Sequence, residues 1–336
     1  MSEIKEKLVV SASPHFKSRT TTRDIMLDVI IALIPALIGA CIIFGLRSLL
    51  LTAVSIVACV CFEYISRRIM KRHNTIGDLS AVVTGMLLAF NVPVEFPVWM
   101  LVIADFFAIV IAKQFFGGIG QNFVNPALVG RVVLIASFPS QMNTFMTPAI
   151  CVKQSGVDAV TTATPLNQIT SVITSDGNLD GLPDMLSMFL GIRGGVLGEV
   201  CIAGLLLGFI YLLIRKVISP AIPLCYMGTV AIIMLIASGS LKVTAYELMA
   251  GGLVLGAVFM ATDYATSPIS IRGKIIYAIG CGLITSLIRI FGNLAEGVSF
   301  SIIIMNILVP HIERLTTPKP FGTVKEKKEK EEAKDQ

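Results

Sequence analysis

Residues 25–45 read IMLDVIIALIPALIGACIIFG, and this apolar run decides what kind of fold the chain adopts. A helix needs about 20 such residues to cross a hydrocarbon core that is roughly 30 Å thick. The preceding residues, 1–24, are polar and basic, and no small-residue cleavage site follows the run. We therefore expect a retained membrane helix here and not a cleaved signal peptide.

The composition of the whole chain agrees with a membrane location. Of its 336 residues, 54% are hydrophobic and 15% are charged, and the mean hydropathy is +0.81. These values exclude an ordinary soluble domain. Clear apolar runs span 25–45, 48–65, 97–113, 196–214, 221–238, 274–291 and 298–312, and less uniform ones span 79–92, 121–138 and 247–262. We predict an all-α polytopic membrane protein with about ten transmembrane segments.

The basic residues predict the orientation of these segments. Lys and Arg are enriched in cytoplasmic loops, and ten crossings with both termini in the cytoplasm place most of them there, including Lys113 at the end of its segment. The loop 139–192 contains Lys153 and four aspartates, so we predict that it is extracytoplasmic. The net charge of +5 forms no contiguous basic face. We therefore expect membrane lipid, and no nucleic acid, as a partner.

The chain is predicted to have five parts. They are a cytoplasmic N-terminal segment (1–24), a first membrane half (25–138), the extracytoplasmic loop (139–192), a second membrane half (193–314) and a charged cytoplasmic tail (315–336).

Each membrane half contains a short apolar segment that opens with an acidic residue, at 78–93 and at 247–262. Three residues match between these segments at a constant offset of 169 positions: Leu79 with Leu248, Ala81 with Ala250, and Phe90 with Phe259. Interrupted segments in corresponding positions are typical of inverted repeats. Chance similarity of two apolar, Gly-bearing stretches is the alternative.

The extracytoplasmic loop contains a threonine-rich stretch, residues 158–164, that reads DAVTTAT and is followed by Pro165 and Leu166. It resembles the D-x-x-[ST]-x-A-T site at which a flavin transferase joins FMN to the final threonine through its phosphate. Threonine, aspartate and proline also favour turns and helix caps. A turn-rich loop without a cofactor is therefore the alternative.

Further stretches carry a family resemblance over nearly the whole chain. They read GGIGQN at 117–122, NPALVGR at 125–131, DAVTTATPL at 158–166, GVLGE at 195–199 and MATDYATSP at 260–268. In order and spacing, the chain resembles the D subunits of the Rnf complexes, the ion-translocating ferredoxin:NAD oxidoreductases of bacterial membranes. It is also similar to the B subunits of the sodium-pumping NADH:quinone reductases.

The resemblance implies a fold, a cofactor and partners. The fold is a ten-helix bundle of two pseudo-repeated five-helix halves, similar to urea-channel architecture, in the bacterial cell (inner) membrane. The cofactor is FMN bound covalently to Thr164, with Asp158, Thr161 and Ala163 completing the motif; riboflavin as a second, non-covalent flavin is left open. Many family members have glycine in place of Thr162, so Thr161 or Thr162 could compete for the FMN. The implied partners are the A, B, C, E and G subunits of the Rnf complex and the flavin transferase.

Ionisable residues inside the predicted segments are candidates for a functional role, because a charge at membrane depth is costly. Arg131 follows a helix break and could face a flavin phosphate or ring. Asp263 lies in another break and could bind a non-covalent flavin or take part in ion passage. Glu63 and Asp28 lie near segment ends and are expected to reach the membrane interface. The remaining candidates are Asp105, Glu199 and Arg289. For each residue, a structural ion pair is an equal alternative.

These features predict an electron-carrying subunit of a redox-driven pump for Na⁺ or H⁺. Neither a nicotinamide-binding motif nor an iron–sulfur motif is present, and the seven cysteines form no C-x-x-C pair, so we predict no metal site. The chain would therefore belong to a translocase that is complete only with its partner subunits. The alternative function is a solute channel or secondary transporter on the same inverted-repeat bundle.

Overall fold

The computed structural model describes residues 20–146, 161–162, 166, 169, 182–292 and 297–318. Almost all regular structure in these ranges is helical, so the predicted helical membrane protein is confirmed. The exception is a pair of two-residue strands, β1 (Phe145–Met146) and β2 (Thr161–Thr162), which run antiparallel within the loop between the two halves.

The first half begins with two long helices, α1 (Thr22–Phe44) and α2 (Leu46–Ile69). The short helices η1 (Ile76–Asp78) and α3 (Ser80–Phe90) follow, and α4 (Val98–Phe106) then continues directly into η2 (Phe107–Gln114), a π-helix. The half ends with α5 (Pro126–Ser137) and the single turn α6 (Pro139–Met142).

The second half shows a similar succession of long and short helices. After α9 (Met185–Leu190) come α10 (Ile202–Ile214), α11 (Ala221–Ser238), α12 (Leu241–Met249) and α13 (Leu253–Leu255), which continues as the π-helix η3 (Gly256–Met260). Two long helices, α14 (Ile271–Phe291) and α15 (Val298–Thr316), complete the described part.

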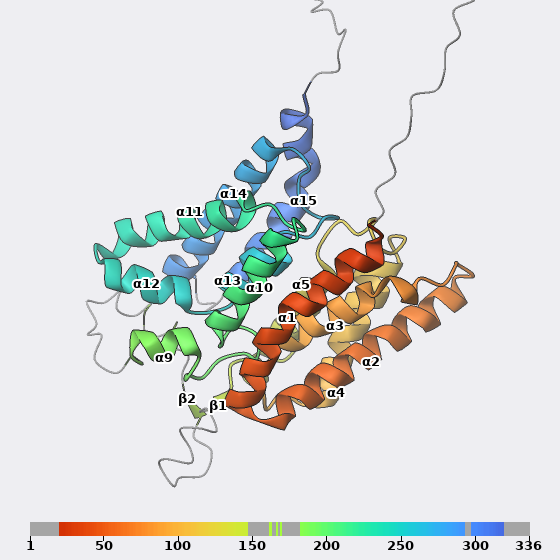
Figure 1. The fold of residues 1–336 in the computed structure, drawn as a ribbon, viewed down its shortest axis with the longest axis horizontal. Helices are drawn as coiled ribbons and strands as arrows, with labels where there is room; N and C mark the ends of the chain where they lie inside the picture. Colours follow the sequence, from red (N-terminus) through yellow and green to blue (C-terminus); the bar gives the residue numbers. More distant parts are fainter. Residues whose placement is uncertain are drawn as a thin grey trace, which may run out of the picture.

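The two halves meet along α1 and α10 (Figure 1). Helices α2 to α5 lie on one side of this pair, and α11, α14 and α15 lie on the other. Small residues allow the close contact: a Cβ added to Gly204 of α10 would lie 2.9 Å from the backbone of Ala36 in α1, as is common between helices in membranes. The start of α1 and the end of α15 lie at one end of the molecule, and β1, β2 and α9 lie at the other.

Fewer helices than expected are long enough to cross a membrane alone. In the described ranges these are α1, α2, α11, α14 and α15. The segments Leu241–Met249 (α12) and Leu253–Met260 (α13 with η3) are bent by 65° relative to each other and make a sixth span if they cross the membrane together. The less uniform predicted runs correspond to short helices, α3 and α5, and to the bent pair. The prediction of about ten full crossings therefore stays a prediction.

One predicted segment, 196–214, is wrong in its first part. The helix begins at Ile202, and residues 193–200 form a buried irregular segment instead. Gly198 explains the difference, because its N–H donates to the carbonyl of Phe90 over 2.8 Å and a Cβ at this position would lie 2.7 Å from the Cγ of Phe90. Residues 193–200 therefore pack against the end of α3 and do not form a helix.

Candidate functional site

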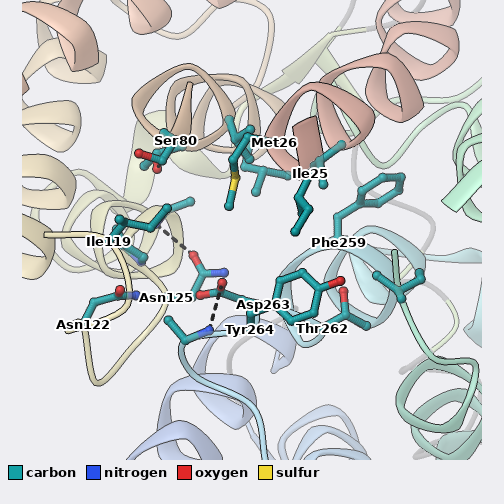
Figure 2. A pocket seen from close by; sticks show the side chains of 18 of the residues that line it. Ile25, Met26, Ser80, Ile119, Asn122, Asn125, Phe259, Thr262, Asp263 and Tyr264 are labelled. Atoms are coloured by element: carbon teal, nitrogen blue, oxygen red, sulfur yellow. Dashed lines mark hydrogen bonds between the residues drawn. The ribbon is translucent and has the colours of Figure 1, made fainter. Parts of the chain in front are cut away.

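A cavity lies between the two halves at the end of the molecule where α1 begins. Its empty volume is about 790 Å³, part of which opens to the outside. Side chains of α1, α3, α10 and η3 form apolar walls, and the breaks after η2 and η3 supply most of the polar groups (Figure 2). Apolar walls with a few convergent polar groups are typical of cofactor and small-molecule sites.

The break after η2 is shaped by glycines. Gly117, Gly118 and Gly120 have φ angles of 128°, 105° and 80°, a region in which residues with a side chain are strained. This turn brings Asn122 and Asn125 to the cavity. The motif GGIGQN therefore has a backbone role, which agrees with the predicted break.

Asn125 connects the two halves. Its Oδ1 accepts from the N–H of Ala127 over 3.0 Å and caps α5, with Pro126 at the first helical position. Its Nδ2 donates to the carbonyl oxygen of Met260, at the end of η3, over 3.2 Å. One side chain thus orders both breaks beside the cavity.

Asp263 lies in the break after η3 and lines the cavity, with its carboxylate between Asn125 and Tyr264 in Figure 2. Its Oδ1 accepts from the N–H of Ala265 over 3.4 Å, and its Oδ2 accepts from the hydroxyl of Thr266 over 3.2 Å. These bonds are local, so the carboxylate is held in place without an ion pair among the described residues. The structure therefore brings Asp263 to the place where a bound ligand would meet it.

For Glu63 and Asp28 the structure shows the alternative, a structural ion pair, and their position relative to the membrane interface stays a prediction. Glu63 is fully buried and pairs with Lys113 over 2.8 Å, and the same ammonium donates to the hydroxyl of Ser80 over 2.7 Å. Asp28 is 6% exposed and pairs with Arg215 over 3.2 Å. A buried charge needs such a partner, because water does not solvate it.

Arg131 lies apart from the cavity, in the interior of the first half. Its guanidinium is 3% exposed, and Nη1 donates to Oδ1 of Asn91 over 2.5 Å. The Nδ2 of Asn91 reaches Sδ of Met260 at 3.8 Å. Polar contacts therefore lead from Arg131 through Asn91 and Met260 to Asn125 at the cavity, and Arg131 and Asp263 do not share one site.

Sequence reasoning missed Asn91. The signal was an amide directly after a short apolar run, at the point where the following prolines end the helix. It also missed the arginine Arg193, whose guanidinium is 3% exposed and donates to the carbonyl oxygens of Glu199 over 3.1 Å and Met249 over 2.7 Å.

The predicted covalent flavin site lies largely outside the described residues. This applies to Asp158, Ala163 and Thr164. Of Thr161 the structure describes the backbone, which pairs with Met146. Leu166, two positions after Thr164, is 1% exposed and belongs to an apolar cluster with Tyr246 and Ala250 of the second half.

No group of three or more metal-ligating side chains occurs in the part of the chain that the structure describes. The cavity offers apolar walls, with amide, hydroxyl and carboxylate groups at the breaks and Ser80 across from them; Thr84 and Lys113 line it as well. Such an arrangement can hold a flat ring whose edge carries hydrogen-bond donors and acceptors.

Comparisons with known proteins agree with this picture. A family model described as "NQR2, RnfD, RnfE family" matches residues 9–322. The D subunit of the Na(+)-translocating ferredoxin:NAD(+) oxidoreductase complex of Acetobacterium woodii is 45% identical over 325 residues, which cover 96% of this chain and 98% of the relative.

Two further relatives have related names. The D subunit of the proton-translocating ferredoxin:NAD(+) oxidoreductase complex of Clostridium ljungdahlii is 40% identical over 331 residues, which cover 96% of this chain and 98% of the relative. The D subunit of the ion-translocating oxidoreductase complex of Stutzerimonas stutzeri is 37% identical over 337 residues, which cover 90% of this chain and 93% of that protein. The resemblance inferred from the motifs is confirmed, and the chain belongs to the NQR2, RnfD, RnfE family.

Proposed function

We propose that this chain is the D-type membrane subunit of a ferredoxin:NAD oxidoreductase complex that moves Na⁺ or H⁺, and that it carries electrons through FMN bound covalently to Thr164. The observation that carries the proposal is the stretch 158–164, within a chain that aligns with ferredoxin:NAD oxidoreductase subunits over 96% of its length. The A, B, C, E and G subunits would supply the ferredoxin and NAD sites, and a flavin transferase would attach the FMN.

The proposed topology has ten membrane segments in two inverted halves, with both termini in the cytoplasm. One contact supports the repeat. Asn91 and Met260 are 169 positions apart, the offset that relates the matched segments, and their side chains touch. Equivalent residues of an inverted repeat meet where the pseudo-two-fold axis passes between them.

A second pair of contacts is a looser parallel, because its cations (Lys113 and Arg289) are 176 positions apart and its acceptors (Ser80 and Glu247) are 167 apart, not 169. In the first half, Lys113 near the end of η2 donates to Ser80 at the start of α3. In the second half, Arg289 near the end of α14 pairs with Glu247 of α12 over 2.8 Å. In both halves, a buried cation on a later helix holds the short segment that precedes a break.

We also propose that the cavity takes a second, non-covalent flavin, with riboflavin as the first candidate. The fit rests on the apolar walls formed by Met26, Leu87 and Phe259 and on the polar groups of Asn125 and Asp263. A flavin supplies reversible electron transfer, while the protein sets its position and surroundings. Asp263 would accept a hydrogen bond from the ring, and the apolar walls would exclude water. The strands β1 and β2 and the cavity lie at opposite ends of the described structure.

Intact-mass spectrometry tests the covalent FMN. The chain is produced together with its flavin transferase, and we expect a single FMN adduct that is lost in Thr164→Ala. Thr162→Ala, at the motif position that any residue can occupy, and Thr161→Ser, which keeps the motif, are matched controls, and we expect both to retain the adduct. An unmodified wild-type chain, or an adduct that persists in Thr164→Ala, would contradict the assignment. A colourless protein that conducts solute in liposomes would favour the channel alternative.

A further inference from the structure

A polar cluster lies between α2, α3 and α4, and none of its members lines the cavity. It consists of Ser55 and Cys59 of α2, the carbonyl of Gly85 in α3 and Asp105 of α4. The hydroxyl of Ser55 lies 2.6 Å from Oδ1 of Asp105 and 2.9 Å from the carbonyl oxygen of Gly85. The thiol of Cys59 lies 3.2 Å from the same Oδ1. Both side chains on α2 and the carboxyl of Asp105 are fully buried.

The number of hydrogen atoms available for hydrogen bonds in this cluster indicates whether Asp105 is protonated. A serine hydroxyl has one hydrogen to donate, yet the hydroxyl of Ser55 faces two oxygens, the carboxyl of Asp105 and the carbonyl of Gly85. If Asp105 is a carboxylate, one of these two contacts has no hydrogen. If Asp105 is protonated, it donates to Ser55, and Ser55 donates to Gly85, so both contacts are hydrogen bonds. The geometry therefore fits a neutral carboxylic acid.

Among the described residues, the surroundings of Asp105 offer no cation that is not already paired with another group. On α2, Cys61 is exposed, and Glu63 forms an ion pair with Lys113 of η2. On α3, the hydroxyl of Thr84 donates to the carbonyl oxygen of Ser80, and the hydroxyl of Ser80 contacts Lys113. On α5 the charged residue is Arg131, which donates to Asn91. The Oδ2 of Asp105 has no hydrogen-bond partner in the described part of the chain, and an isolated carboxylate at such depth is strongly disfavoured.

A sodium ion fits this place poorly. Hard metal ions need a shell of oxygen ligands, whereas the cluster has the oxygens of Asp105, Ser55 and Gly85 beside a thiol and the apolar side chains of Ala81 and Ile109. The π-helix η2 begins two residues after Asp105. Such π-helical turns are frequent at functional sites.

We propose that Ser55, Cys59 and Asp105 form a proton-binding site within the first membrane half and that its occupancy takes part in ion coupling. Release of the proton breaks the O–H bond of Asp105, leaves the electron pair on the carboxylate and transfers the proton to a water molecule. The hydroxyl of Ser55 then turns from Gly85 to Asp105, where it and the thiol of Cys59 stabilise the carboxylate. The binding site stands on geometry alone, and its part in coupling rests on the proposed function.

Infrared spectroscopy of the purified complex tests proton binding. A protonated carboxyl absorbs above the amide bands, so subtracting the spectrum of Asp105→Asn from that of the wild type should leave one C=O band that shifts in D₂O. Ser55→Ala removes a hydrogen-bond partner and should move this band, whereas Thr52→Ala, a buried hydroxyl that bonds within α2, should not. No band at neutral pH, or no shift in Ser55→Ala, would overturn the site.

Proteoliposomes test the part in coupling. Asp105→Asn keeps the shape and polarity of the side chain, so a purely structural role predicts unchanged transport. We expect this variant to reduce NAD with ferredoxin in the presence of an uncoupler but to lose proton uptake per electron, and Asp105→Glu to restore part of it. Unchanged uptake in Asp105→Asn, or sodium uptake without proton movement in the wild type, would overturn this role. A wild type without FMN would refute the proposed function and leave the infrared result intact.

Discussion

Lys113 illustrates what a charged side chain requires inside this protein. In the sequence, Lys113 lies at the end of an apolar run, and the charge pattern therefore predicts that it lies in a loop. In the structure it is 3% exposed and is held by Glu63 and Ser80. The partners lie 50 and 33 positions away, so no local pattern could reveal them.

Separate removal of the two charges should show how the Glu63–Lys113 pair works. Glu63→Gln leaves the ammonium of Lys113 buried without a counter-charge, and we expect the free energy of unfolding to fall by about 3–5 kcal/mol. The double variant Glu63→Gln with Lys113→Met should be closer to the wild type, because no isolated charge remains. Unfolding in detergent measures both. The exposed pair Arg47–Glu95, 3.3 Å apart, is the control, and Glu95→Gln should cost less than about 1 kcal/mol.

Asn125 allows its two roles to be separated. Asn125→Ser keeps an oxygen that can cap α5 but loses the donor to the carbonyl of Met260, and it adds no charge at this buried position. Asn125→Ala loses both, and the missing cap alone should cost about 1 kcal/mol. We therefore expect Asn125→Ser to be more stable than Asn125→Ala, yet to bind added riboflavin more weakly than the wild type, as measured by flavin fluorescence. Equal flavin affinity in wild type and Asn125→Ser would argue against this residue as part of the proposed flavin site.

At the scale of elements, apolar runs predict helices well and helix ends poorly. Every predicted run contains a helix in the structure, because an apolar segment in lipid must satisfy its own backbone. The breaks depend on the surrounding protein, because irregular backbone persists in membranes only where protein encloses it. The bend of 65° after α12 occurs where Arg193 and Arg289 bind the carbonyls of Met249 and Ala250, and the sequence around 249–253 contains no sign of either arginine.

The glycine turn after η2 should be sensitive to a single methyl group. Gly118 has a φ of 105°, and an added Cβ would collide with the guanidinium of Arg67. We expect Gly118→Ala to lower stability by at least about 1–2 kcal/mol and to reduce flavin binding in the cavity, because the turn carries Asn122. Gly77→Ala is the matched control, since a Cβ there meets nothing within 4 Å. A thermal shift assay with and without riboflavin compares them, and equal behaviour of both variants would contradict the role of the turn.

For the whole molecule, the division into two membrane halves stays a prediction from the sequence, and the cavity between α1, α3, α10 and the two breaks could not be predicted. Its lining comes from α1, α3, α10 and the two breaks, and packing of α1 against α10 brings these parts together. The match at an offset of 169 positions indicated related halves without indicating that Asn91 and Met260 touch. Motif spacing identified Asp263 as a candidate because it lies in a break, and the same reasoning could not separate it from Arg131, which is buried elsewhere.

Topology mapping tests the arrangement of the whole molecule. The start of α1 and the end of α15 lie at one end of the molecule, with β1, β2 and α9 at the other (Figure 1), and the basic residues favour a cytoplasmic position for the first of these ends. Alkaline phosphatase fused after Asn143 should therefore be active, because it would be exported. Fusions after Arg72 and after Lys216, which carry the same enzyme to predicted cytoplasmic positions, should be inactive. An inactive fusion at Asn143 alongside active ones at the other two sites would place the loop 139–192 in the cytoplasm, where exchange with free FMN would remove the need for the proposed covalent bond.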